Sequence, residues 1–310
     1  MHYAVMIAVF IAVACQHDLA SFAWINLGTQ AFLFTAFACI PAYRTSKMSF
    51  VDAAWPLGLV ALGVQTLIFG DLHSSLTITV AGIYLFMGAR MAWWACGFVY
   101  SGKSFNELPR YRYQRIRWNK AGLRSEQLSI QVEILLQGCA NATILALPAL
   151  LVASYSANPF GIAALVGVVL WVLAYVFESL ADAQKARFGR MNARQGVRGR
   201  TCDIGLWRYS RHPNYFGQWM QWNALIVMVI PILIDRWDDT SLWAWVLVVA
   251  GILAASASMY YTLVVFTGAE PSEYYSLQSR PDYAEYQRTT NKFFPGPTHV
   301  AELTRPVAGI

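Results

Sequence analysis

The sequence contains few charged residues. Asp, Glu, Lys and Arg together make up 13% of its 310 residues, whereas about a quarter is usual for a soluble domain. Acidic residues are fewer than basic residues, 17 against 23. The mean hydropathy is +0.40. This balance argues against a soluble fold. It also argues against nucleic-acid binding, which would need a basic face on a soluble module.

Cysteine is scarce as well. Of the five cysteines, four lie in apolar runs and no two are spaced as CxxC, so we expect neither a disulfide nor a zinc site. The chain also lacks a GxGxxG segment after a strand, a Walker loop and an HExxH motif, which excludes a Rossmann domain, a P-loop and a zinc protease of that type. We therefore expect no metal. The lack of internal repeats argues against a transporter.

Long apolar runs are abundant. A helix that crosses a bilayer needs roughly 17–25 mostly apolar residues, and most of these runs are long enough. The first and third are short, so the sequence predicts eight spans, with seven as the alternative. The expected fold is all-α, a polytopic membrane helix bundle with 7–8 transmembrane helices. The runs cover residues 2–15, 21–42, 55–70, 75–100, 130–154, 160–182, 213–234 and 242–266.

Basic residues alternate between the connecting segments. Seven Lys and Arg lie in 101–129 and eight in 183–212, and four follow residue 266, whereas the loops 16–20, 71–74 and 155–159 have none. Cytoplasmic loops of membrane proteins carry the excess of Lys and Arg. We therefore expect the basic loops and the C-terminus to face the cytoplasm.

Several apolar runs contain polar residues, which are costly in lipid and need a partner or a task. Glu178 and Asp182 are four residues apart and share one helix face. Asn214, Gln218 and Gln221 share a face of the run 213–234. Both sets lie beside basic loops, and we interpret them as parts of a site. A further polar set, for which interhelical hydrogen bonding and a role in a site both stay open, comprises Glu133, Gln137 and Asn141.

The segment GLWRYSRHPNYFGQ (205–218) is the densest polar and aromatic cluster of the chain. Pro213 is suited to the first turn of a helix, whose unpaired N–H groups favour an anion. The second basic cluster, 101–120, interleaves arginine with Tyr and Trp. Arginine binds phosphate through two hydrogen bonds and stacks on planar rings. Both segments therefore suit a large anionic cofactor approached from the cytoplasm.

The segment 205–222, GLWRYSRHPNYFGQWMQW, resembles the signature of the steroid 5-alpha-reductase superfamily, especially its bacterial branch, domain of unknown function 1295 (DUF1295). The resemblance extends over about residues 50–296 and implies a helix bundle whose cofactor cavity opens to the cytoplasm, in a bacterial inner membrane. It suggests an N-terminal helix or helix pair (1–45), a reductase domain (46–296) and a tail (297–310). Matching pieces are DAAW (52–55), GAR (88–90), GKSFNELPRY (102–111), ESLADAQKARF (178–188) and RPDYAEYQRTTNKFFP (280–295).

The activity implied by this resemblance is transfer of hydride from NADPH to the activated C=C bond of a lipophilic enone, steroid-like or another lipid, which enters from the bilayer. The proton donor would be Asp52 or Tyr84. Three departures from the family pattern are Met87 in place of a tyrosine, Leu108 in place of Asp, and Gln218 in place of the usual Glu. The implied cofactor-binding residues are Arg90, Lys103, Arg110, Tyr111, Asp182, Trp207, Arg208, Tyr209, Arg211, His212, Asn214, Tyr215, Gln218 and Tyr275.

Two other functions fit parts of the same pattern. Isoprenylcysteine and phospholipid methyltransferases carry a similar RHPxYxG element and bind S-adenosylmethionine, which makes a membrane methyltransferase the main alternative. A sterol- or lipid-binding protein without catalysis is the other, favoured by the lost tyrosine and glutamate. Membrane lipids are expected partners in every case, whereas the identity of the substrate and the oligomeric state are left open by the sequence.

Overall fold

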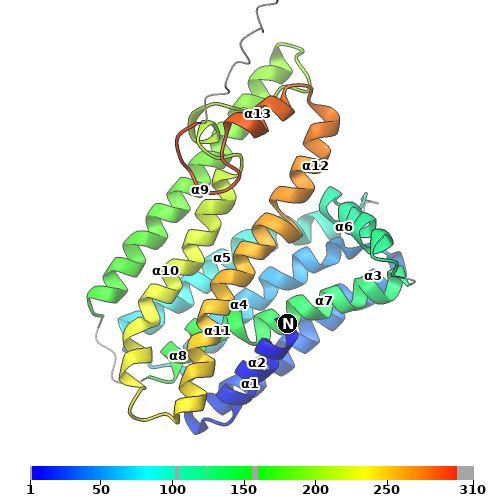
Figure 1. The fold of residues 1–310 in the computed structure, drawn as a ribbon. Helices are drawn as coiled ribbons and strands as arrows, with labels where there is room; N and C mark the ends of the chain where they lie inside the picture. Colours follow the sequence, from blue (N-terminus) through cyan, green and yellow to red (C-terminus); the bar gives the residue numbers. More distant parts are fainter. Residues whose placement is uncertain (1, 102–104, 124, 156–159, 299–310) are drawn as a thin grey trace, which may run out of the picture. The chain divides into compact units, whose positions relative to one another are not determined.

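The computed structural model describes residues 2–101, 105–123, 125–155 and 160–298, and these residues form helices joined by short connections, with no strand among them (Figure 1). The apolar runs form the long helices. The helices are α1 (His2–Ala14), α2 (His17–Phe34), α3 (Ile40–Thr45), α4 (Val51–Phe69), α5 (Ser75–Val99), α6 (Pro109–Lys120), α7 (Glu126–Ala142), α8 (Leu147–Ala153), α9 (Ile162–Arg194), α10 (Pro213–Asp235), α11 (Leu242–Tyr261), α12 (Ala269–Ser279) and α13 (Tyr283–Thr289), with the short turns η1 (Thr35–Cys39), η2 (Met48–Phe50), η3 (Ile144–Ala146), η4 (Gly205–Arg208) and η5 (Thr262–Phe266).

Seven helical segments in the described residues are long and apolar enough to cross a membrane. The protein is therefore a multi-pass helical membrane protein, and seven, the lower of the two expected numbers, is the one found. The first apolar run forms α1, whose 13 residues give about 20 Å of helix against a bilayer core of about 30 Å, so it is not among the seven. The third run starts earlier than expected, at Met48. The spans are His17–Thr45, Met48–Phe69, Ser75–Val99, Glu126–Ala153, Ile162–Arg194, Pro213–Asp235 and Leu242–Ser279.

The chain divides into two compact units, which we describe separately. The first consists of residues 1–171 and 222–259, and the second contains 172–221 and the chain from Tyr260 on. In the first unit α4 packs along α5, and α2 contacts both α4 and α7. The domain boundaries that the sequence suggests, at residues 45 and 296, stay a prediction.

A polar network inside the first unit provides hydrogen bonds where a membrane helix is interrupted. The helical path of α7 is interrupted at Thr143 (φ −122°, ψ −96°), which frees backbone carbonyls that lipid cannot satisfy. The Asn26 side chain donates to the carbonyls of Asn141 (3.3 Å) and Ala142 (3.2 Å), and the Asn141 amide donates to the Trp55 carbonyl (3.0 Å). Of the two interpretations left open for Asn141, the interhelical hydrogen bond is the one found.

The second unit is built on the C-terminal part of α9. The connection from α9 to α10 folds back onto this helix, and α12 and α13 complete the unit. The Trp207 indole N–H donates to the Ala181 carbonyl (2.8 Å). Both residues belong to a small apolar core with Phe188 and Cys202. The basic connection is therefore packed against α9, which gives the residues around it fixed positions.

Candidate functional site

The two polar helix faces expected from the sequence meet within the second unit. The Asn214 amide on α10 donates to a carboxylate oxygen of Asp182 on α9 (3.0 Å). One to two turns further along α10, the buried Gln221 amide donates to Glu178. The i, i+4 spacing on α9 and the i, i+7 spacing on α10 therefore place two carboxylates opposite two amides.

A glycine allows these helices to approach each other closely. A Cβ atom added at Gly217 would lie 2.9 Å from the Glu178 backbone nitrogen and 3.0 Å from the Ala174 carbonyl oxygen. Both distances are shorter than van der Waals contact, and both involve backbone atoms, which cannot move aside as a side chain can. Small residues of this kind commonly let membrane helices pack closely. The pairs formed by Asp182 and Glu178 depend on this close approach.

Two acceptors at this helix pair have no hydrogen-bond partner among the described residues. They are the side-chain oxygens of Asn214 and Gln221, and both atoms are buried. A buried acceptor without a donor costs about 1–3 kcal/mol, so a ligand that brings N–H groups would relieve the cost. The carboxamide of a nicotinamide ring has two such N–H donors. One such N–H group suits either acceptor, so the residues present are compatible with the cofactor that the sequence suggests.

The first part of the 205–218 segment packs against the C-terminal part of α9. The Leu206 amide donates to the Gln184 side chain (2.8 Å), and the Lys185 ammonium lies 4.0 Å from the centre of the Trp207 ring. Arg208 and Tyr209 follow and are exposed. Trp207 thus anchors η4, and the next two predicted residues are accessible to a ligand.

Arg211 and His212 form a buried hub with Glu273 of α12. The Arg211 guanidinium donates to both Glu273 oxygens (2.8 and 3.3 Å) and also to the carbonyls of Gln287 (2.9 Å) and Thr290 (2.6 Å). The His212 ring nitrogen lies 3.0 Å from Glu273. Burial lowers the pKa of His212 below its usual value, although Glu273 opposes that shift. The contacts found here hold the C-terminal segment in place, and a role of either residue at a cofactor stays a prediction.

The remaining predicted residues of the second unit lie around this hub. The Tyr215 ring stacks on the His212 ring, with centroids 5.4 Å apart and planes 2° from parallel. Gln218 lies one turn after Asn214 on α10, half-buried. Tyr275 is half-buried on α12, with its ring against that of Tyr274 (5.1 Å). None of these positions tests the predicted contact with a cofactor.

In the first unit the structure brings together three of the predicted residues. Arg110 forms an ion pair with Asp52 (2.6 Å), and the Tyr111 hydroxyl donates to the other oxygen of the same carboxylate. Burial and the neighbouring Asp52 raise the pKa of Tyr111 well above its usual value, so this phenol keeps its proton. The predicted basic loop is partly helical here, because Pro109 starts α6.

Tyr84, the other candidate proton donor, is fully buried in the first unit. Its hydroxyl donates to the Leu145 carbonyl (2.6 Å) next to the break after α7. The Trp222 ring lies 6.1 Å from the Tyr84 ring and 6.2 Å from that of Trp55. The Trp222 indole N–H is buried and has no hydrogen-bond acceptor among the described residues. A phenol and an indole donor therefore lie side by side in an apolar interior.

Two predicted residues add little to this geometry. Arg90 is half-buried on α5, six residues after Tyr84, and Lys103 lies outside the described residues. Sequence reasoning missed two carboxylates that organise their surroundings. Glu273 is the centre of the hub, and Glu107 accepts from the backbone of Met48 (2.8 Å) and Ser49 (3.0 Å). Glu107 lies inside the matched segment 102–111, and its place directly before the basic α6 was the available signal.

Comparison with known proteins adds a family. A family model described as a protein of unknown function, DUF1295, matches residues 36–290. No curated protein matches the chain, and no solved structure does.

Proposed function

The chain belongs to the DUF1295 family, and from that starting point we propose that it is a membrane oxidoreductase that uses NADPH. The proposed reaction adds hydride to the β carbon of an α,β-unsaturated carbonyl in a lipophilic molecule. Steroid-like enones and other lipid enones are the proposed substrates. They would reach the protein from the bilayer, which is the phase in which they dissolve.

The observation that carries this proposal is the polar pairing between α9 and α10. The Asn214 side-chain N–H donates to the Asp182 carboxylate. The buried side-chain oxygen of Asn214 is then an acceptor without a partner among the described residues. Gln221 is held by Glu178 in the same way, and its oxygen is also left without a partner. Asn214 and Gln221 are seven residues apart, about 10 Å along α10, so each acceptor suits a separate N–H or O–H donor of a ligand, and a carboxamide is one such donor. Such preorganised groups are what a protein contributes when a cofactor supplies the chemistry.

Bound NADPH would supply the hydride, and this chain's residues would orient it. Asn214 would accept a hydrogen bond from the nicotinamide carboxamide, and Gln221 would accept from a different donor of the bound ligand, while Asp182 and Glu178 fix the orientation of those two amides. Of the two candidate proton donors, we favour Tyr84. Both oxygens of Asp52 already accept hydrogen bonds, from Arg110 and Tyr111. The Tyr84 proton is directed at a neutral carbonyl, which a substrate carbonyl could replace.

Charge distribution supports a cytoplasmic cofactor side. The segments that follow the third, fifth and seventh candidate spans contain most of the Lys and Arg residues, and such segments face the cytoplasm. NADPH is a cytoplasmic metabolite, so a binding site beside these segments has access to it. We propose the bacterial inner membrane as the location.

Transfer of deuterium tests the reaction. Detergent-purified protein is incubated with NADPH that carries deuterium on the reactive nicotinamide carbon, together with a 3-oxo-4-ene steroid, a polyprenyl enal and an enoyl lipid. We expect mass spectrometry to find deuterium on the β carbon of at least one reduced product, and Asn214→Ala to lose this label. The matched control Asn119→Ala replaces an exposed asparagine on α6 and should retain it. Methyl transfer from S-adenosylmethionine to a lipid, without any deuterium transfer, would overturn the proposal.

A further inference from the structure

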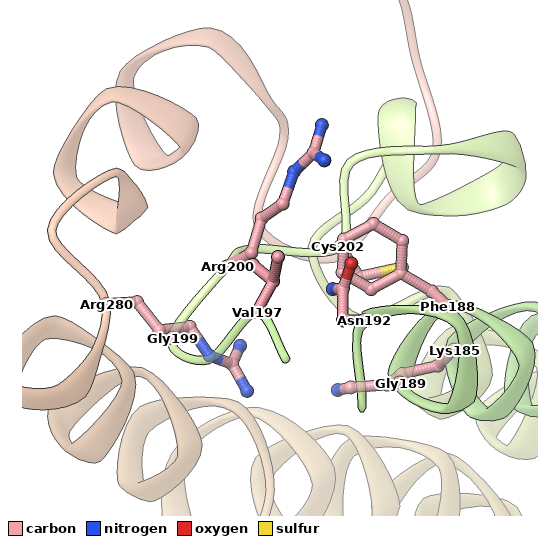
Figure 2. A pocket seen from close by; sticks show the side chains of 9 residues that line it. All are labelled: Lys185, Phe188, Gly189, Asn192, Val197, Gly199, Arg200, Cys202 and Arg280. Atoms are coloured by element: carbon pink, nitrogen blue, oxygen red, sulfur yellow. The ribbon is translucent and has the colours of Figure 1, made fainter. Parts of the chain in front are cut away.

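A second polar site lies elsewhere in the second unit, at the C-terminal end of α9. A pocket of about 220 Å³ opens between this helix, the chain that follows it and the residue after α12. Four lining residues lie at positions i, i+3, i+4 and i+7 of α9 and so share one face of the helix, namely Lys185, Phe188, Gly189 and Asn192. Figure 2 shows the polar ends of Lys185, Asn192 and Arg280 turned towards one opening.

The pocket brings two positive charges close together. Among the described residues, Lys185 and Arg280 form no ion pair, and their like charges repel each other. Asp282, two residues after Arg280, accepts hydrogen bonds from the backbone and hydroxyl of Thr201 (3.0 and 2.5 Å). Two like charges held close together are costly, and an anionic ligand between them would lower that cost.

The loop that forms the wall of the pocket is held in a defined conformation. Gly199 has a positive φ of 72°, and a Cβ atom there would lie 3.0 Å from the Ser279 carbonyl oxygen. The hydrogen bonds from Thr201 to Asp282 fix the same loop to the start of α13. The site is therefore formed before any ligand arrives, which reduces the entropy cost of binding.

Two of the cations that line the pocket make cation–π contacts, which leave their charge in place. The Lys185 ammonium lies over Trp207 (4.0 Å). The Arg200 guanidinium lies 5.8 Å from the Phe188 ring centre, and in Figure 2 it extends away from the opening. Lys185 and Arg280 thus remain as the pair of charges available to a ligand.

We propose that this pocket binds a phosphomonoester group. Such a group carries a charge of about −1.5 to −2 at pH 7 and three acceptor oxygens, which matches two cations and the Asn192 amide. A pocket of 220 Å³ is smaller than the range of about 300–1,000 Å³ typical of pockets for whole drug-sized ligands. It suits the phosphate end of a larger molecule, or a free phosphate.

One source of this group is the proposed cofactor. Asp182 and Asn192 are ten residues apart on α9, about 15 Å along the helix, a distance that an extended dinucleotide can span. The 2′-phosphate of NADPH would then lie in the pocket, and the pocket would distinguish NADPH from NADH. That assignment rests on the proposed function, whereas the phosphomonoester site itself does not. Inorganic phosphate and the headgroup of phosphatidic acid carry the same chemistry.

Calorimetric titration of the detergent-purified full chain tests the site. The probes are inorganic phosphate, adenosine 2′-monophosphate, dihexanoyl phosphatidic acid and, as the control without phosphate, adenosine. We expect saturable binding of at least one phosphate probe and none of adenosine, with affinity falling as salt is raised. The tightest probe identifies the source of the group.

Two variants locate the binding. Arg280→Gln and Lys185→Gln should each weaken binding of the phosphate probe at least tenfold, and Arg280→Gln leaves the Lys185–Trp207 contact intact. Arg288→Gln is the matched control, because Arg288 lies on α13 and is exposed. Absence of saturable binding for every phosphate probe, or binding that neither pocket variant weakens, would overturn the site.

The same titrations separate this site from the proposed function. If adenosine 2′-monophosphate binds in a manner that depends on Arg280 while NADPH does not bind, the phosphomonoester site stands and the reductase proposal fails. If NADPH binds equally well to the wild type and to Arg280→Gln, and no smaller phosphate probe binds, the reductase proposal stands and this site is overturned.

Discussion

Gly217→Ala is the sharpest test of the helix pair that organises the candidate site. The added methyl group would lie 2.9 Å from the backbone nitrogen of Glu178 and 3.0 Å from the carbonyl oxygen of Ala174. Forcing an extra carbon into packed backbone costs about 1–3 kcal/mol. In the opposite direction, alanine is favoured over glycine in a helix by up to about 1 kcal/mol. The net effect on stability alone is therefore small and needs a reference.

Gly82→Ala supplies that reference. Gly82 lies on α5, also within a helix, and a Cβ atom added there would meet no atom within 4 Å. The helix-propensity gain is common to both variants, so the difference between their free energies of unfolding isolates the steric cost, about 1–3 kcal/mol. We expect Gly217→Ala to be the less stable by this amount in equilibrium unfolding in mild detergent. It should also weaken NADPH binding, because separating α9 from α10 stretches the Asp182–Asn214 hydrogen bond. Equal stability of the two variants would refute the close approach of α9 and α10.

Three further predictions concern the hub and the proton donor. Glu273→Ala should lower the free energy of unfolding by about 3–5 kcal/mol, because it leaves buried Arg211 without its carboxylate. The control Glu285→Ala removes an exposed ion pair and should lower it by at most about 1 kcal/mol. Comparable losses of stability in the two variants, measured by thermal unfolding, would contradict this prediction. Since burial lowers the pKa of His212, the unfolded chain binds more protons, and the free energy of unfolding should fall as pH drops below about 6.5. His212→Gln should flatten that part of the unfolding-against-pH curve, and an unchanged curve would refute the assignment. Tyr84→Phe should reduce turnover of the enone while leaving the dissociation constant of NADPH unchanged, and a weaker NADPH affinity measured by titration would argue against its role as proton donor.

The membrane fold was predictable because length and apolar composition alone determine most spans. The helix that begins at Pro213 was also predictable, since proline suits a first turn and a polar face follows it. At the N-terminus the sequence left seven or eight spans open, and seven segments of the described residues are long enough. The run 2–15 has the apolar composition of a transmembrane helix, but α1, which it forms, has only 13 residues.

The candidate site was predictable where the signal is local. Glu178 and Asp182 share a face by their spacing, and so do Asn214 and Gln221, which placed the two halves of the pairing correctly. The partner of Arg211 was not predictable, because Glu273 is 62 residues away in the chain and belongs to a different helix. Nothing in its local sequence distinguishes this glutamate from a solvated one. Arg280 was missed as a pocket residue for the same reason.

The measurement that tests the central claim most directly is a thermal-shift titration of the purified protein with NADPH and with S-adenosylmethionine. A ligand that binds only the folded state adds about 2.7 kcal/mol of apparent stability at a hundredfold excess over its dissociation constant. We predict that NADPH raises the unfolding temperature of the wild type and that Asn214→Ala and Asp182→Ala abolish the rise. Stabilisation by S-adenosylmethionine with no response to NADPH would contradict the proposed function and assign the 205–218 segment to a methyltransferase.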